Sequence, residues 1–455
     1  MSIRDSNKFF MIATVIMPII LAGCAVSDTE KYSIKAAEQQ QRIEAWKQTQ
    51  EQAQHVSLLT DIISAPELTR LIQTGLEHNP SVQQAKLAVQ IAQKSQTSVN
   101  SAFWPQANVS LQGNKTESSD ESYNANLTVS WEADIWGKNW DSATKAQLNT
   151  KNQIFAEQYS KDLLAASIMR SWLQLIQQRQ LIEIEANNVS ILQQNEATIL
   201  ERYRKGLGSL EDLDTARSST QSAHATLAQY EESYQQVLRS LHSTLGGKTL
   251  TAMPMTNFPE VLTPLAALPQ QDLARRPDLR QAFINVQTAE LDVDIAYKSM
   301  LPSLSLEASL ADAGSSVSDA LFTSGVWSVL GRLSAPLFQG GRLKAQAEIN
   351  ELVAEQKYWA YQQTLLTAVQ EVENALGQEA SLAKQQQHIE ASLASARRST
   401  QSYQEKYRQG LLSFIDLMTV QRQAFSLETQ LTNLTYQRLN NRITLGLALG
   451  LGVSK

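Results

Sequence analysis

Two hydrophobic periods alternate along this chain, and each predicts a different element. Apolar side chains recur every three or four residues over 67–102, which predicts helix up to the stop at Pro105. The period then becomes two over about 106–113 and again over about 125–136, which predicts two strands. A helical stretch followed by a hairpin of strands is therefore the first predicted unit.

The same succession returns in the second half of the chain. Alternation over about 303–311 and about 326–338 predicts two more strands, separated by a loop rich in serine, glycine and aspartate. We therefore expect four strands in two hairpins, each strand with one apolar and one polar face.

Long uninterrupted helices are predicted after each pair of strands. From about Lys138 to Gly206, and again from about Arg342 to Gly410, there is no proline and almost no glycine. A helix of 69 residues would be about 100 Å long. Apolar residues on a seven-residue lattice favour side-by-side coiled packing, and only Glu196 interrupts them: Ile168, Leu175, Ile182, Val189 and Tyr203.

The chain repeats one plan twice. Residues 201–213 read ERYRKGLGSLEDL and residues 405–417 read EKYRQGLLSFIDL, with eight of thirteen positions identical. Two tandem repeats are therefore expected. The first repeat covers 66–250 and contains a helical hairpin at about 138–246. The second covers 270–455 and contains a helical hairpin at about 342–449, and a proline-rich connector at 251–269 joins the two repeats.

The N-terminus has the pattern of a lipoprotein signal. Residues 1–23 combine basic residues, a short apolar run and small residues before Cys24, which predicts cleavage and lipid attachment at Cys24. The alternative is an ordinary signal peptide with an incidental cysteine. Cys24 is the only cysteine, so the lipidated product would have no disulfide and no thiolate metal ligand. Ala25 follows it rather than aspartate, which in bacterial lipoproteins favours the outer membrane, and residues 24–65 would form a partly ordered arm.

Composition and spacing disfavour several other functions. Cleavage leaves 37 basic and 44 acidic residues, a net charge of −7, which disfavours nucleic-acid binding. After the signal no apolar stretch approaches the roughly 18 residues of a spanning helix. The histidines show no metal-ligand spacing: His55, His78, His224, His242 and His388. Catalytic spacing is also missing, so we expect no enzyme, no bound metal and no cofactor besides the lipid on Cys24.

Alternating strands fit either a sheet with one wet face or a membrane barrel with one face in lipid. The secretory address and four tryptophans near strand ends favour the barrel: Trp104, Trp131, Trp136 and Trp327. Four strands cannot close a barrel, because barrels begin at about eight strands, and lipid tolerates no open sheet edge. The chain is therefore expected to share a barrel with copies of itself, and its long helices to continue the lumen as a tube.

Motifs in a fixed order carry a family resemblance. They are Arg276-Pro277-Asp278-Leu279-Arg280, Leu301-Pro302-Ser303-Leu304, Ser130-Trp131-Glu132-Ala133-Asp134-Ile135-Trp136-Gly137, Ala335-Pro336-Leu337-Phe338-Gln339-Gly340-Gly341-Arg342, and the duplicated Tyr-Arg-x-Gly-Leu-x-Ser-x-x-Asp-Leu. Nearly all of the mature chain resembles the TolC-like outer-membrane efflux proteins, specifically the lipidated branch that serves resistance–nodulation–division pumps. The resemblance implies a mainly α fold with a β-barrel part: a homotrimer whose twelve-stranded transmembrane barrel continues into a long helical coiled-coil barrel in the periplasm of a Gram-negative bacterium.

The duplicated motif places Gly206 and Ser209 between two helices in the first repeat, and Gly410 and Ser413 in the second. The glycines end the long helices and the serines cap the returning ones. The resemblance implies that these turns form the periplasmic mouth of the tube and dock a periplasmic adaptor.

An aspartate, Asp212 or Asp416, follows each cap by three residues. One interpretation is a capping box that also suits the helix dipole. The other is a gate in which threefold symmetry brings three Asp416 side chains to the axis, with Asp212 nearby and Leu412 as an apolar ring. Residues placed to hydrogen-bond neighbouring helices and hold the mouth shut are Tyr203, Arg204, Tyr407 and Arg408. Leu412 and Thr419 stand where TolC has an arginine and a second aspartate, so the polar lock of TolC cannot be carried over intact.

Three functions remain open from the sequence. The first is a passive exit duct that conducts drugs or other toxic compounds from an inner-membrane transporter and its adaptor to the exterior. The second is the outer-membrane component of a one-step protein secretion or metal-ion system, although eight methionines, three of them in the signal, offer little support for a thioether-lined path. The third is a lipidated periplasmic coiled-coil scaffold, which would leave the alternating strands unexplained.

Overall fold

The computed structural model describes residues 31–43, 45–46, 54, 56–117, 119–248, 256–266, 269–322 and 325–453. The predicted signal, Cys24 and part of the connector lie outside these residues. The chain divides into two compact units. Unit 1 comprises residues up to 38, 91–151 and 282–361, and unit 2 comprises 39–90, 152–281 and 362–455.

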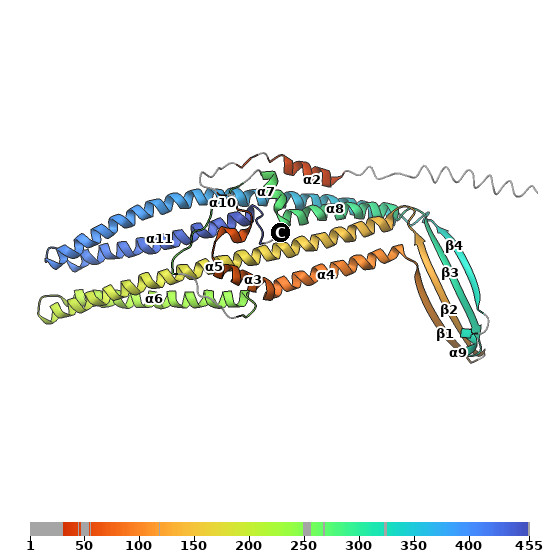
Figure 1. The fold of residues 1–455 in the computed structure, drawn as a ribbon, viewed down its shortest axis with the longest axis horizontal. Coiled ribbons are helices and arrows are strands. Elements are labelled where there is room, and N and C mark those ends of the chain that lie inside the picture. Colours follow the sequence, from red (N-terminus) through yellow and green to blue (C-terminus); the bar gives the residue numbers. More distant parts are fainter. Residues whose placement is uncertain are drawn as a thin grey trace, which may run out of the picture. The chain divides into compact units, whose positions relative to one another are not determined.

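Unit 1 contains an antiparallel sheet of four strands in the order β1-β2-β3-β4 (Figure 1). The strands are β1 (Gln106–Thr116), β2 (Ser119–Ala133), β3 (Ser303–Gly314) and β4 (Val326–Ser334). Each neighbouring pair in this order is hydrogen-bonded along its length. Within the described residues no strand pairs with the outer edge of β1 or of β4.

The register of the strands separates apolar from polar side chains. Val109 lies opposite Leu127, Leu127 opposite Leu310, and Leu310 opposite Trp327, so one apolar row crosses all four strands. Side chains at the ends of this row are exposed, Val109 at 75% and Trp327 at 77%. The apolar face of the sheet is therefore uncovered in the single chain.

The ends of the strands differ from the predicted ones in several places, and β3 runs to Gly314 rather than to about 311. The polar residues 114–116 and 119–123, which the predicted strands leave out, continue the hairpin, because paired backbone needs no apolar side chain. β2 ends at Ala133, since the carboxylate of Asp134 accepts hydrogen bonds from the backbone of Asn139 and Trp140 at 3.0 and 2.9 Å. β4 ends at Ser334, two residues before Pro336, which has no N–H to donate.

Two helical hairpins of equal dimensions dominate the described residues. One comprises α5 (Lys138–Arg204) and α6 (Leu210–Thr244), and the other α10 (Arg342–Arg408) and α11 (Phe414–Ala448). The long helices have 67 residues and the returning helices 35.

The main apolar core of unit 2 lies where α5 and the returning helices α6 and α11 pack around shorter elements. Trp172 is fully buried there, as are Ile168 and Leu175 of the predicted seven-residue lattice. Tyr203, the last member of that lattice, is 41% exposed. The lattice therefore marks buried positions near the middle of α5 but not at its end.

Shorter elements complete the fold. They are α2 (Tyr32–Gln41), η1 (Leu59–Ile62), α3 (Pro66–His78), α4 (Pro80–Asn100), η2 (Ser101–Phe103), α7 (Pro269–Arg275), α8 (Pro277–Lys298) and α9 (Val317–Phe322). Prolines open α3, α4, α7 and α8, where the missing N–H has no partner within the helix. None of the helices in the described part of the chain is long and apolar enough to cross a membrane.

Candidate functional site

The turn between α5 and α6 has the geometry of a Schellman cap. Gly206 has a φ of +70°, and its N–H donates to the carbonyl of Tyr203 at 2.9 Å. The N–H of Leu207 donates to the carbonyl of Arg202 at 2.8 Å. These bonds satisfy the last carbonyls of the helix, and the positive φ explains the glycine.

The turn between α10 and α11 repeats this geometry. Gly410 has a φ of +76° and donates to the carbonyl of Tyr407 at 3.0 Å, while Leu411 donates to that of Lys406 at 2.9 Å. Ser209 and Ser413 are the N-caps of α6 and α11, as predicted. Both turns lie at the same end of unit 2 (Figure 1).

The two caps differ in the use of their aspartates. The hydroxyl of Ser209 accepts from the backbone N–H of Asp212 at 3.0 Å, without the reciprocal bond of a capping box. At the second turn Asp416 completes the box, because its Oδ2 accepts from the N–H of Ser413 at 3.1 Å and from the hydroxyl at 2.6 Å. The carboxylate of Asp416 therefore accepts hydrogen bonds from its N-cap residue. The carboxylate of Asp212 accepts no such bond from Ser209.

Leu412 does not share a helix face with Asp416. A spacing of four residues would put the two side chains on one face of a helix, but α11 begins at Phe414 and Leu412 lies before the N-cap. It is half-buried in the turn. A shared helix face for Leu412 and Asp416 is therefore wrong, while the apolar ring at Leu412 stays a prediction about several copies.

The four aromatic and basic residues expected to link helices behave differently from one another. Tyr407 packs on Phe414, with ring centroids 6.2 Å apart and planes at 56°. Arg204 pairs within its own helix with Glu201 at 3.5 Å. Arg408 and Tyr203 are exposed. Within one chain these residues do not act together as a polar lock.

Contacts that the sequence did not single out join the two hairpins near the turns. Phe414 is buried in a cluster with Ile199, Leu213 and Ala216, so the start of α11 packs against α5 and α6. Further along, Asn195 donates to Gln421 at 3.1 Å. Phe414 falls opposite Leu210 in the duplicated motif, and this change from leucine to an aromatic residue was the available signal.

Apolar side chains are exposed around both turns. Leu207 and Leu411, the residues after the two glycines, are each 67% exposed, and Leu210 and Ile415 are exposed nearby. Large exposed apolar side chains grouped at one end are typical of a protein interface. The turns thus combine rigid backbone with a surface suited to a partner.

The remaining predicted sites offer less structural information. Cys24 and His55 lie outside the described residues. Among the described residues, no three side chains from histidine, cysteine, aspartate and glutamate gather in a way that could hold a metal ion.

Comparison with known proteins identifies the family. The model of the outer membrane efflux protein family matches residues 71–247 and 268–451. The match falls into two stretches, one for each half of the chain, and together they make up most of it.

Three curated relatives align over most of their length. The probable outer membrane lipoprotein SilC of Salmonella typhimurium is 26% identical over 407 residues, covering 85% of this chain and 86% of SilC. The cation efflux system protein CusC of Escherichia coli is 26% identical over 398 residues, with the same coverage of both chains. The pyoverdine export outer membrane protein OpmQ of Pseudomonas putida is 25% identical over 409 residues, covering 86% of this chain and 87% of OpmQ.

A solved structure agrees in fold. The open-state outer membrane channel MtrE of Neisseria gonorrhoeae superimposes with a TM-score of 0.81 at 21% identity, covering 90% of this chain and 96% of that one. The predicted family is thereby confirmed: the chain belongs to the outer membrane efflux proteins.

Proposed function

We propose that this chain is the exit duct of a tripartite efflux pump and that three copies form it. Each copy contributes four strands to a twelve-stranded barrel in the outer membrane and two helical hairpins to a tunnel in the periplasm. Cys24 carries the lipid that anchors each copy. The duct is passive, with no catalytic residue and no cofactor besides that lipid, so the energy comes from an inner-membrane transporter.

The sheet supports the barrel most directly. Its apolar row from Val109 to Trp327 is uncovered, and within the described residues its outer edges on β1 and β4 have no partner strand. Hydrocarbon accepts an apolar face but no unpaired backbone. Pairing β4 of one copy with β1 of the next satisfies both conditions, and the family resemblance sets the number of copies at three.

Aromatic side chains delimit the apolar face of β2. Tyr123 stands at the loop end of this face and Trp131 at the end nearest the helices, where its indole N–H donates to the carbonyl of Phe103 at 3.1 Å. Trp104, beside it, is 73% exposed. Aromatic residues at both boundaries of an apolar band are typical of membrane barrels.

The helix that leaves the edge strand supports contact between copies. α10 follows β4 and exposes Leu352, Trp359 and Leu366 at intervals of seven residues, each more than 60% exposed. A seven-residue apolar stripe is the pattern of coiled-coil packing. We assign this stripe to the neighbouring copy.

The equal dimensions of the two hairpins and the two-part family match support tandem repeats. Three copies of two hairpins supply the twelve helix positions of the tunnel. We assign the turns at Gly206–Ser209 and Gly410–Ser413 to adaptor docking, because their rigid caps present exposed apolar side chains. Asp416 and Asp212 converge on the axis as a gate in this arrangement.

The names of the relatives do not agree on a cargo. CusC belongs to a cation efflux system and OpmQ to pyoverdine export, and both are about equally similar to this chain. We therefore propose that the partner pump determines the cargo, and that drugs or other toxic compounds are the leading candidates. Metal ions and secreted proteins are the alternatives within the same fold.

Cysteine crosslinking tests the shared barrel, because lipidated Cys24 leaves no other thiol in the chain. Ser334→Cys is combined in turn with Gln106→Cys, Asn108→Cys and Ser110→Cys, so that several registers between β4 and β1 are sampled. We expect at least one pair to give oxidised dimers and trimers on a denaturing gel, while the single variants stay monomeric. Absence of crosslinked oligomers in every pair, with a monomer in detergent, would exclude the barrel.

A further inference from the structure

Between Asn124 and the helices, charged side chains on the polar face of the sheet are confined to the two rows nearest the helices. The strand register places Glu132, Ser305 and Arg332 in one row across β2, β3 and β4. The next row contains Ser130, Glu307 and Leu330. Rows further from the helices are uncharged up to Asn124, and they include Thr128, Ser309 and Ser328.

Two of these charges have no ion pair in the part of the chain that the structure describes. Glu132 pairs with Lys138 at 2.8 Å. Neither Glu307 nor Arg332 forms an ion pair with any residue that the structure describes, although they are diagonal neighbours on adjacent strands. Diagonal cross-strand neighbours lie about 7–8 Å apart, so each charge acts on the other but remains open to water.

A neighbouring copy would not neutralise them through its first strand. The polar face of β1 carries Gln106, Asn108, Ser110 and Gln112. All four side chains are uncharged, so a β1 strand paired with β4 would bring only amides and hydroxyls toward Arg332.

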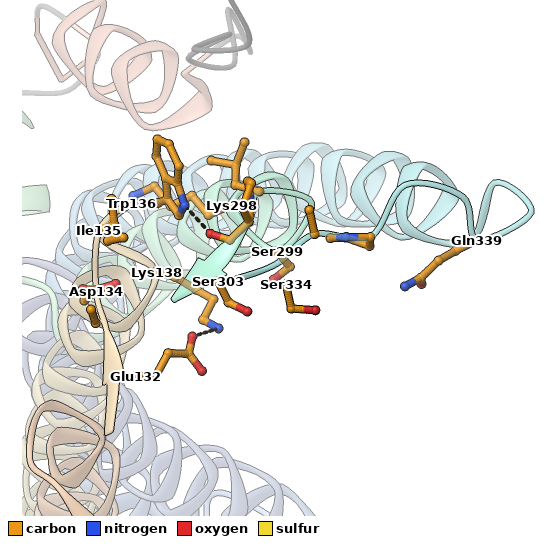
Figure 2. A pocket seen from close by; sticks show the side chains of 15 residues that line it. Glu132, Asp134, Ile135, Trp136, Lys138, Lys298, Ser299, Ser303, Ser334 and Gln339 are labelled. Atoms are coloured by element: carbon orange, nitrogen blue, oxygen red, sulfur yellow. Dashed lines mark hydrogen bonds and ion pairs between the residues drawn. The ribbon is translucent and has the colours of Figure 1, made fainter. Parts of the chain in front are cut away.

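Glu132, which shares a row with Arg332, lines a hollow at the junction of sheet and helices. Its volume is about 440 Å³, and its lining includes Glu132, Ser303 and Ser334 of the polar face. Figure 2 shows Lys138 extended toward Glu132 at this hollow, and Lys298 and Ser299 come from the end of α8. The polar face here is therefore a water-accessible surface bordered by charges of both signs.

We propose that Glu307 and Arg332 set the ion selectivity of the open duct. The proposal rests on the exit-duct function above, in which threefold symmetry makes the two rows a belt of three Glu307 and three Arg332 around the lumen. The belt acts on small ionic solutes and on charged groups of a cargo. Rings of charged side chains select ions by the sign of their charge. In this belt the negative charge of Glu307 and the positive charge of Arg332 offset each other, so removing either one leaves an excess of the opposite sign.

Planar bilayer recording under a KCl gradient tests the belt. Glu307→Gln should move the reversal potential toward chloride and Arg332→Gln toward potassium, each by about twofold in permeability ratio. Glu121→Gln and Lys115→Gln are matched controls. Both lie at the loop end of the β1–β2 hairpin, away from the helix-proximal rows, and they form a pair of their own at 2.6 Å. We expect them to leave the ratio unchanged.

The outcomes separate the belt from the duct. Wild-type protein that forms no channel overturns the exit-duct proposal and the belt with it. Channels whose reversal potential is the same in wild type, Glu307→Gln and Arg332→Gln overturn the belt alone. A gel that detects the trimer identifies any variant that fails to fold. If one of Glu307→Gln and Arg332→Gln fails, the other still tests the belt.

Discussion

The carboxylate of Asp416 accepts two hydrogen bonds from Ser413, at 3.1 Å from its backbone nitrogen and 2.6 Å from its hydroxyl. The corresponding pair in the first turn, Ser209 and Asp212, makes only the bond from the backbone of Asp212 to the serine. Two turns of nearly the same sequence thus use their aspartates unequally. The second turn caps its helix with the carboxylate of Asp416 as well as with Ser413, and the first turn uses Ser209 alone.

Removing each carboxylate should expose this inequality. Asp416→Ala removes the acceptor from the N-cap of α11 and should destabilise its first turn by about 1 kcal/mol. Asp212→Ala should have a smaller effect at α6. Hydrogen exchange of the backbone amides in each first turn measures both, and equal acceleration in the two variants would contradict the assignment.

The proposed gate predicts a block by multivalent cations. Three or six carboxylates converging on the axis attract such cations into the mouth. We expect cobalt hexaammine, added on the side of the turns, to block the channel more weakly in Asp416→Ala than in the wild type, and Asp212→Ala tests its lesser contribution. Glu232→Ala, which removes an exposed carboxylate paired with Arg239, is the control. A block of equal strength in Asp416→Ala would refute a ring at this position.

Asp162 should make the stability of unit 2 depend on pH. Burial raises the pKa of its carboxyl from 3.8 to about 6, while the backbone N–H of Val453 and the amide of Gln158 donate to it at 3.0 and 2.8 Å. Because the folded pKa lies above the unfolded one, this group's contribution is complete below about pH 4 and is lost as the pH rises through 6.

Asp162→Asn tests this dependence. Between pH 5 and pH 7.5 the wild type should lose about 1 to 2 kcal/mol of stability relative to the variant, which keeps the acceptor oxygen without the charge. Denaturant unfolding at both values measures the difference. Asp214→Asn, at an exposed position, should show no such trend.

Arg276 holds together the start of the second half of the chain. It is 7% exposed and lies 2.7 Å from both Asp278 and Glu371, and it also donates to the carbonyl of Ala448. Arg276→Met leaves two carboxylates without their cation, so we expect a loss of about 3 kcal/mol or more.

An exposed ion pair provides the comparison for Arg276. Arg239 pairs with Glu232 at 2.5 Å, and both side chains are more than half exposed. Arg239→Met should therefore change stability by less than about 1 kcal/mol. Thermal unfolding of both variants in detergent measures the difference, and a similar small effect in each would show that the Arg276 contacts are not stabilising.

The strand positions and the turn geometry followed from local sequence. A period of two determines which side chains share a face, and glycine and serine at fixed offsets determine how a helix ends and the next begins. The signals at 106–113 and at Gly206 and Gly410 are local in this sense. The family could be identified because such local motifs occur in a fixed order.

Other features depend on contacts between distant residues. Residues 114–116 and 119–123 extend the hairpin although they lack the alternation that predicts a strand, because their backbone pairs across the two strands. Phe414 is buried because α11 packs against α5 and α6. The ion pair of Arg276 with Glu371 joins residues almost one hundred positions apart. No periodicity in the sequence contains this information.

The outer edges of β1 and β4, which no strand of the described residues pairs with, have a consequence for a newly exported copy. A strand edge with unpaired backbone pairs with any extended segment that it meets, including that of a misaligned sister chain. In the proposed duct, a copy that has not yet paired these edges is therefore prone to aggregate before it reaches its neighbours.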